Sequence, residues 1–174
     1  MVDEVGVVTI ADAQARRLNR IDPAGKRAMV AFLRAPRYEV LPTDDIEQRV
    51  LAAVPHDVTI TVTASPRRGI EATIGLAERL AGQGYHVVPH ISARLIRDDA
   101  HLREVLERVA TLGRNEIFVV AGDAKEPAGA FPDSVSLLTA LMREPHGMRE
   151  IGVTGYPERH SFIEDDLTIQ AMWD

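Results

Sequence analysis

The stretch Glu116-Ile117-Phe118-Val119-Val120-Ala121-Gly122-Asp123 decides the fold of this chain. Its first half is nearly all apolar, which is typical of a strand that is covered on both faces of a parallel sheet. A glycine and an aspartate follow at once. Four other strand-like runs end in the same way, in a residue suited to chemistry. Those four residues are Glu39, Thr63, His90 and Tyr156.

The spacing of these five strand ends predicts repeated strand–helix–strand units. From Glu39 to Tyr156, successive members are 24, 27, 33 and 33 residues apart, and one such unit takes roughly 30 residues. The carboxyl ends of parallel strands share one side of the protein, and that side holds the active site. The sequence therefore predicts a parallel α/β fold with a single pocket at the strand ends. The predicted strands are residues 37–41, 58–63, 85–90, 116–120 and 150–155.

Helical patterns separate these strands and also precede them. Residues 10–34 read as helical, with a break at Asp22-Pro23, where Asp22 is a predicted N-cap and Pro23 the first helical residue. The sequence thus predicts an N-terminal helical extension at 1–36, followed by the repeating domain at 37–174. Later helices are predicted near 43–51, 68–83, 98–113, 133–143 and 163–173.

Composition narrows the classes of function. The 174 residues suit one domain, and 26 acidic against 20 basic side chains give a net charge of −6. A phosphate backbone rewards clustered positive charge, so nucleic-acid and anionic-membrane partners are not expected. The chain has no cysteine, which excludes disulfides, thiolate nucleophiles and cysteine-bound metals. No apolar run approaches the roughly 20 residues that span a bilayer, and we predict a cytoplasmic protein.

Individual site candidates have simpler explanations as well as functional ones. Glu39 ends an apolar strand, where partial burial suits a carboxyl group to general acid work; alternatively it forms a salt bridge with Arg37. Gly122-Asp123 would let a ligand approach the backbone while the aspartate accepts a hydrogen bond from a ring N–H. The alternative for Gly-Asp is an ordinary turn or helix cap.

A metal site is a further possibility in the sequence. His90, Asp123 and His160 together would imitate a mononuclear site on the rim of a barrel hydrolase. However, no His-x-His pair follows the first strand, and we predict no metal. Neither Gly-x-Gly-x-x-Gly nor a P-loop is present, so a Rossmann nucleotide site has no support.

Five motifs, taken in chain order, resemble the methylenetetrahydrofolate reductase family. They are Tyr38-Glu39-Val40-Leu41-Pro42, Val62-Thr63, Pro89-His90-Ile91-Ser92-Ala93-Arg94, Ala121-Gly122-Asp123 and Gly155-Tyr156-Pro157-Glu158-Arg159-His160. Members of this family are (β/α)8 TIM barrels that carry a flavin. They reduce 5,10-methylenetetrahydrofolate to 5-methyltetrahydrofolate with NADH or NADPH, in one-carbon and methionine metabolism.

The resemblance implies a role for each matching residue. Glu39 matches the general acid that helps to open the five-membered ring of the folate. Asp123 matches the aspartate beside flavin and folate, and it is preceded by Gly122. The remaining matches are to positions that line the FAD site, namely Thr63, His90, Tyr156, His160 and Asp166.

Departures from the family pattern set two further expectations. Ala121 stands where the family has the arginine of an Arg-Gly-Asp element, which removes one cationic contact and predicts weak binding of FAD. The residues at 37–174 match only about the first five β/α units of the barrel. A barrel loses its edges only when it closes, so we expect a homo-oligomer. Two alternatives to an active reductase remain open. The first is a partial barrel that binds folate or flavin without turnover, or that needs a partner chain for activity. The second is a metal-dependent barrel hydrolase.

Overall fold

The protein is described here from a computed structural model, which defines residues 22–143, 145–155 and 166. The chain divides into two compact units between Pro36 and Arg37. Each unit is described by itself.

The first unit contains helix α2, Pro23–Arg34. The predicted start of this helix is confirmed, because the Asp22 side chain accepts a hydrogen bond of 2.6 Å from the Gly25 N–H and Pro23 follows as the first helical residue. No residue of α2 is buried, and the Phe32 side chain is 76% exposed.

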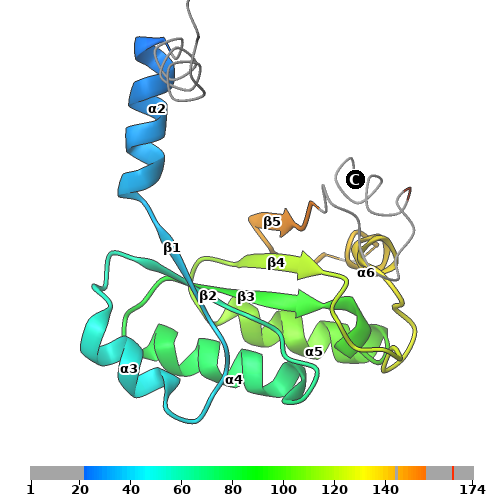
Figure 1. Cartoon of the computed structure of the whole chain (residues 1–174). Helices are drawn as coiled ribbons and strands as arrows, with labels where there is room; N and C mark the ends of the chain where they lie inside the picture. Colours follow the sequence, from blue (N-terminus) through cyan, green and yellow to red (C-terminus); the bar gives the residue numbers. More distant parts are fainter. Residues whose placement is uncertain (1–21, 144, 156–165, 167–174) are drawn as a thin grey trace, which may run out of the picture. The chain divides into compact units, whose positions relative to one another are not determined.

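The second unit is built on a five-stranded parallel sheet, which confirms the predicted α/β class (Figure 1). Its strands are β1 Arg37–Val40, β2 Thr59–Val62, β3 Val87–Ser92, β4 Glu116–Val120 and β5 Glu150–Val153. They lie side by side in chain order, β1-β2-β3-β4-β5, and every neighbouring pair is parallel. Because the order is sequential, each connection places the next strand beside the previous one on the same advancing edge of the sheet, and the direction of strand addition never reverses. Among the described strands there is therefore no switch point of the Rossmann kind.

Four α-helices and one 3-10 turn connect these strands. They are α3 Ile46–Ala53, α4 Gly69–Gly82, η1 Ala93–Leu95, α5 Asp99–Ala110 and α6 Ser134–Leu141. Two of the helices begin at a capping aspartate, since Asp98 accepts from the His101 N–H and Asp133 from the Ser136 N–H, each at 2.8 Å. These caps satisfy backbone donors that the first turn of a helix leaves unpaired. None of the helices in the described part of the chain is long and apolar enough to cross a membrane.

All of these helices pack on the same face of the sheet. Strand side chains alternate between faces, and one set is aliphatic and almost fully buried. This set comprises Ile60, Val62, Ile91, Ile117 and Val119. They share two apolar clusters with helix side chains, which include Ile74 and Leu76 of α4, Val105 of α5 and Leu137 of α6. Figure 1 shows α3, α4 and α5 lying together along this face.

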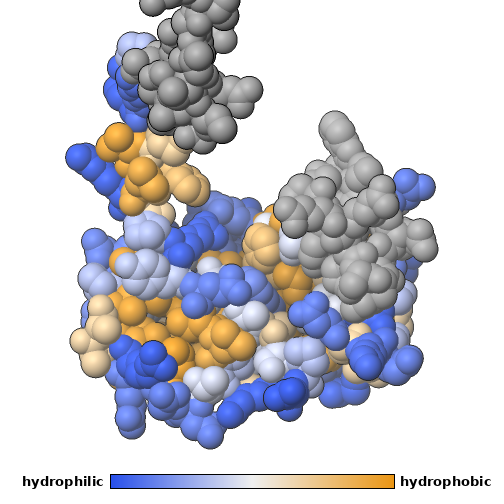
Figure 2. Space-filling model, viewed as in Figure 1, coloured by the Kyte–Doolittle hydropathy of each residue, from blue (hydrophilic) through white to orange (hydrophobic). Residues whose placement is uncertain are grey.

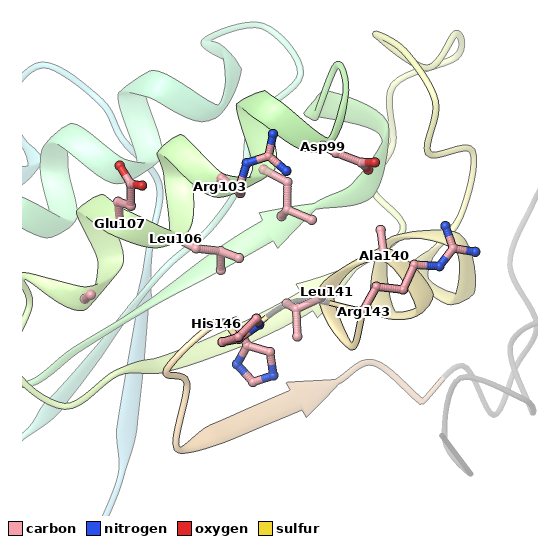
Figure 3. A pocket seen from close by; sticks show the side chains of 11 residues that line it. Asp99, Arg103, Leu106, Glu107, Ala140, Leu141, Arg143 and His146 are labelled. Atoms are coloured by element: carbon pink, nitrogen blue, oxygen red, sulfur yellow. The ribbon is translucent and has the colours of Figure 1, made fainter.

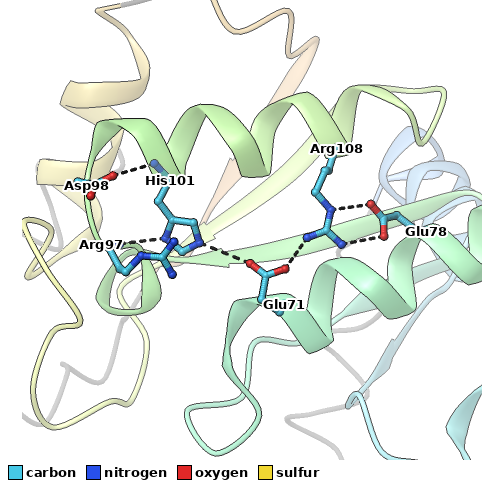
Figure 4. A network of polar contacts seen from close by, with 6 residues as sticks. All are labelled: Glu71, Glu78, Arg97, Asp98, His101 and Arg108. Carbon is cyan, nitrogen blue, oxygen red and sulfur yellow. Dashed lines mark hydrogen bonds and ion pairs between the residues drawn. The ribbon is translucent and has the colours of Figure 1, made fainter.

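An ion-pair network joins α4 to α5 on the outer side of the helix layer (Figure 4). The Arg108 guanidinium donates to Glu78 at 2.7 and 2.8 Å and to Glu71 at 2.5 Å. The two-pronged contact with Glu78 is the geometry in which arginine binds carboxylates best. His101, which is buried, lies at one end of the network, with its Nε2 3.5 Å from Glu71 and its Nδ1 accepting from the Arg97 N–H. The network ties together two neighbouring crossover helices.

Hydrophilic residues cover much of the visible surface of this unit and border an exposed apolar area (Figure 2). Among the described residues of the unit, the large apolar side chains that stay exposed are Tyr38, Leu41, Leu51 and Met142.

One predicted boundary is wrong in a way that affects the site. The third strand was expected at 85–90, ending in His90, but β3 runs from Val87 to Ser92. Its first half pairs with β2 up to Pro89, and its second half, from His90 onward, pairs with β4 instead. Pro89 suggests an end because it lacks an N–H, yet the strand continues by changing its partner. His90 therefore lies inside the strand. Apart from Asp166, which is helical, the predicted helix at 163–173 falls outside the described residues.

Candidate functional site

The face of the sheet opposite the aliphatic layer carries a set of polar side chains in register. Glu39 is paired with Thr61, Thr61 with Val88, and His90 with Phe118. Since residues two apart on a strand point to the same face, Thr63 follows Thr61 on this side. The predicted residues Glu39, Thr63 and His90 thus come from three neighbouring strands and share one face near the carboxyl ends of those strands.

Glu39 and Thr63 are in direct contact. The Thr63 hydroxyl donates to Glu39 Oε1 at 2.6 Å, although the two residues are 24 apart in the chain. The same threonine is held by its backbone, because its N–H donates to the Val40 carbonyl at 2.9 Å. Arg37, the alternative partner of Glu39, lies 3.9 Å from Glu116 instead. The structure therefore joins the first two predicted site residues through one hydrogen bond.

His90 is the third member and is 9% exposed. Burial holds the pKa of its imidazole below the usual value, while the nearby Glu39 carboxylate acts in the opposite direction. Its ring lies against Phe118, with centroids 5.0 Å apart and planes tilted by 32°. At neutral pH His90 is therefore an uncharged imidazole beside a carboxylate.

Gly122 and Asp123 follow β4, as predicted, but the glycine has an internal role. Gly122 has φ +90°, and a Cβ placed there would lie 1.9 Å from Ser92 Oγ. Ser92 thus fills the space through which a ligand was expected to approach. The glycine is needed so that the end of β3 and the loop after β4 can pack together. Asp123, the next residue, is exposed.

Arg94 organises this loop, and sequence reasoning gave it no role. Its side chain is 8% exposed and donates to three backbone carbonyls of the segment 124–132: Ala124 at 2.5 Å, Pro132 at 2.8 Å and Lys125. An arginine two residues after a buried strand is the only signal in the sequence, and it does not reveal which carbonyls are bound. Arg94 holds in place the chain that begins with Asp123.

A second polar group lies toward the amino ends of the strands. His86 Nε2 is 3.1 Å from Glu116, and its Nδ1 is 3.0 Å from the Thr59 hydroxyl. The contact with Glu116 is close but not aligned as a hydrogen bond. Burial lowers the pKa of His86, and Glu116 opposes that effect. A cleft of about 420 Å³ borders this group and is lined in part by Arg37, Glu116 and Glu150.

Another cleft, of about 230 Å³, lies between α5 and α6 (Figure 3). Leu102, Leu106 and Leu141 form its apolar part, and Arg103 and Arg143 lie at its rim. None of the predicted site residues lines it. The group of His86, Glu116 and Thr59 combines the same chemical types at the amino ends of the strands. We assign the candidate site to the carboxyl edge of the sheet, because active sites of parallel α/β proteins lie on that side and Glu39, Thr63 and His90 meet there.

The remaining predicted site residues are Tyr156, His160 and Asp166, and the structure describes only the last of them. Tyr156 and His160 lie outside the described residues, and Asp166 is exposed. Within residues 22–143 and 145–155, no three His, Cys, Asp or Glu side chains are grouped as metal ligands would be. The trio of His90, Asp123 and His160 depends on a residue that lies outside these ranges.

No protein-family model matches this chain.

Proposed function

We propose that this protein is a flavin-dependent reductase of 5,10-methylenetetrahydrofolate. The observation that carries the proposal is the contact between Glu39 and Thr63, beside His90, on one face near the carboxyl ends of three successive parallel strands. The resemblance assigns an acid to Glu39 and cofactor contacts to the other two. All three are among the five residues that the spacing of the predicted strands selects.

The arrangement of the sheet supports a (β/α)8 barrel as the parent architecture. Strand order is sequential, and the crossover helices with their apolar faces lie on one side only. In a doubly wound sheet the order reverses and helices cover both faces. In a barrel, helices form an outer ring while strand side chains fill the inside. We infer that the five units of this chain correspond to part of such a barrel, and that the polar face is its interior.

The donors and acceptors on this face fit a flavin or a folate ring. Such rings are held by hydrogen bonds and ring contacts, and the face offers the Thr63 hydroxyl, the neutral His90 imidazole and the Phe118 ring. Gly122 and Asp123 lie in the loop that follows β4. When bound, a flavin supplies the redox chemistry, accepting hydride from NADH or NADPH and giving it to the folate.

The work of the chain itself is positioning and proton transfer. Glu39 is the group that would give a proton to a nitrogen of the folate as its five-membered ring opens. A general acid must lie within hydrogen-bond reach of the accepting atom. Glu39 is exposed, so the partial burial expected from its place at a strand end is not found in the chain without ligand. Neutral His90 adds no positive charge that would keep Glu39 ionised. Ala121 stands where the family has an arginine, so this chain lacks that cationic contact to the cofactor. Cofactor binding would then depend on the uncharged Thr63, His90 and Phe118 side chains.

The first experiment is a visible absorbance spectrum of the purified chain with and without added FAD, followed by an assay of folate-dependent NADH oxidation. We expect flavin bands, and we expect E39Q to keep them while the rate of folate reduction falls by about 10²–10⁴, the usual contribution of a general acid. The matched control is E104Q, which changes an exposed carboxylate on α5 and should leave the rate unchanged.

Three outcomes decide the proposal. A colourless protein that does not respond to FAD would contradict it. An E39Q variant that reduces folate at the parent rate would remove Glu39 from its role. Flavin binding without any turnover by the parent chain would favour a partial barrel that binds the cofactor but does not catalyse.

A further inference from the structure

We propose that Thr63 is a positioning residue that orients Glu39 and determines which of its oxygens carries the acidic proton. Thr63 donates to Oε1, so the proton of the neutral acid is placed on Oε2. We call the hydrogen bond from the Thr63 hydroxyl to Glu39 Oε1 the clamp, and it is observed directly in the structure. The statement that Oε2 delivers a proton rests on the function proposed above.

Thr63 is suited to this task because it is fixed from two sides. Its N–H donates to the Val40 carbonyl of β1 at 2.9 Å. Its own carbonyl accepts from the hydroxyl of Thr73, a fully buried residue of α4, at 3.2 Å. The hydroxyl that reaches Glu39 is therefore attached to backbone anchored both in the sheet and in a helix.

Glu39 needs such a partner because of where it lies. It belongs to β1, which has a strand neighbour on one side only among the described strands, and the residue is exposed. A free glutamate side chain samples several rotamers, and fixing it costs conformational entropy. The 2.6 Å bond from a rigid donor selects one arrangement. Catalysis gains from such preorganisation because the reacting groups need not search for their geometry.

The clamp also limits what Thr63 can offer to a ligand. A hydroxyl has one donor hydrogen and two acceptor lone pairs. The hydrogen is used on Glu39, so a ring held at Thr63 must present an N–H rather than a carbonyl. The edge of a cofactor or substrate that faces Thr63 must therefore be a hydrogen-bond donor.

His90 provides a readout of the clamp that does not depend on activity. Among the charged groups in the described part of the chain, Glu39 is the one that acts on the pKa of His90, and it raises that pKa against the effect of burial. If Glu39 leaves its clamped position, this support weakens. The imidazole signals of His90, followed by NMR as a function of pH in the chain without ligand, therefore report where the carboxylate lies.

The experiment compares T63V, T63S, E39Q and the double variant T63V/E39Q, with T61V as a matched control. Thr61 is the register partner of Glu39 and lies on the same face two residues before Thr63. Valine keeps the shape of threonine and removes the hydroxyl. We expect E39Q to move the titration midpoint of His90 to lower pH, T63V to reproduce most of that displacement, and T63S and T61V to stay at the parent value.

The double variant separates an action through Glu39 from a direct effect on His90. If Thr63 acts by holding the carboxylate, adding T63V to E39Q produces no further displacement. A T63V midpoint equal to that of the parent would overturn the clamp, and so would equal displacements in the E39Q and parent backgrounds. These results are independent of whether the protein reduces folate.

Kinetics then test the assignment of the proton. In a chain that reduces folate, we expect T63V to lower kcat on the order of tenfold with little change in KM, and T63S to restore it. A displaced His90 titration without any folate reduction would leave the clamp in place and contradict the proposed function. Normal kcat in T63V together with a displaced titration would contradict the role of Oε2.

Discussion

The two faces of the sheet carry side chains of different chemistry, although the same strands supply both sets. On the helix-covered face, Ile60, Ile91 and Val119 are 0% exposed and lie against other aliphatic side chains. On the other face, the side chains of the same three strands include a threonine, a histidine and a phenylalanine in contact with each other or with Glu39. Alternation along a strand places the two sets back to back.

The aliphatic face of the sheet stabilises the unit, whereas the polar face carries the residues suited to chemistry. Burying aliphatic surface contributes roughly 25 cal/mol per Å², so the helix-covered face holds the unit together. A polar side chain adds little net stability even when it is hydrogen-bonded. Its presence on the other face needs a different reason, and the grouping of Glu39, Thr63 and His90 supplies one.

The largest contrast is expected between the truncation of a buried aliphatic side chain on one face and the removal of a hydroxyl on the other. We expect I91A to lower the free energy of unfolding by about 2–5 kcal/mol, because it removes a fully buried side chain and leaves a cavity. T61V on the polar face should change it by less than about 1 kcal/mol. Chemical denaturation of both variants measures the difference, and equal losses would mean that the two faces contribute alike.

A smaller effect tests the close approach between β3 and the loop after β4. We expect G122A to destabilise the fold by about 1–3 kcal/mol, because its methyl group would meet Ser92 and its φ is +90°. G113A is the control, since Gly113 also has a positive φ, +96°, but has open space around it. The excess of G122A over G113A measures the contact with Ser92. No excess would show that the loop moves away freely.

The smallest effect concerns pH. Burial lowers the pKa of His90 from 6.5 in the folded state, so between the two values the unfolded chain binds a proton that the folded chain does not. Stability is therefore complete above about pH 6.5 and falls as the pH drops through this window. A single group contributes at most about 1.4 kcal/mol per pH unit.

The measurement is thermal unfolding of the parent, H90N and H86N between pH 7.5 and about 5. We expect a shallower loss of stability for H90N than for the parent on acidification. H86N should act in the same direction, because burial also lowers the pKa of His86. A slope in H90N as steep as that of the parent would mean that His90 is not buried in its neutral form.

Much of the secondary structure follows from local pattern. The β4 prediction, 116–120, agrees with the structure at both ends, because a short apolar run between turn residues has few alternative conformations. The caps at Asp22 and Asp98 are local as well, since a side chain bonds a backbone N–H three residues away. The end of β3 was misjudged because it depends on a change of partner strand at Pro89 and His90.

The sequence by itself determined that strands and helices alternate, that the sheet is parallel, and which polar residues stand near strand ends, because hydrophobic period and spacing are properties of neighbours in the chain. Tertiary structure decided which of these residues meet. Thr63 and Glu39 are joined across 24 residues, Ser92 occupies the space beside Gly122, and Arg94 binds a loop some 30 residues away. Such contacts depend on strand register and loop path, which only packing of the whole unit defines.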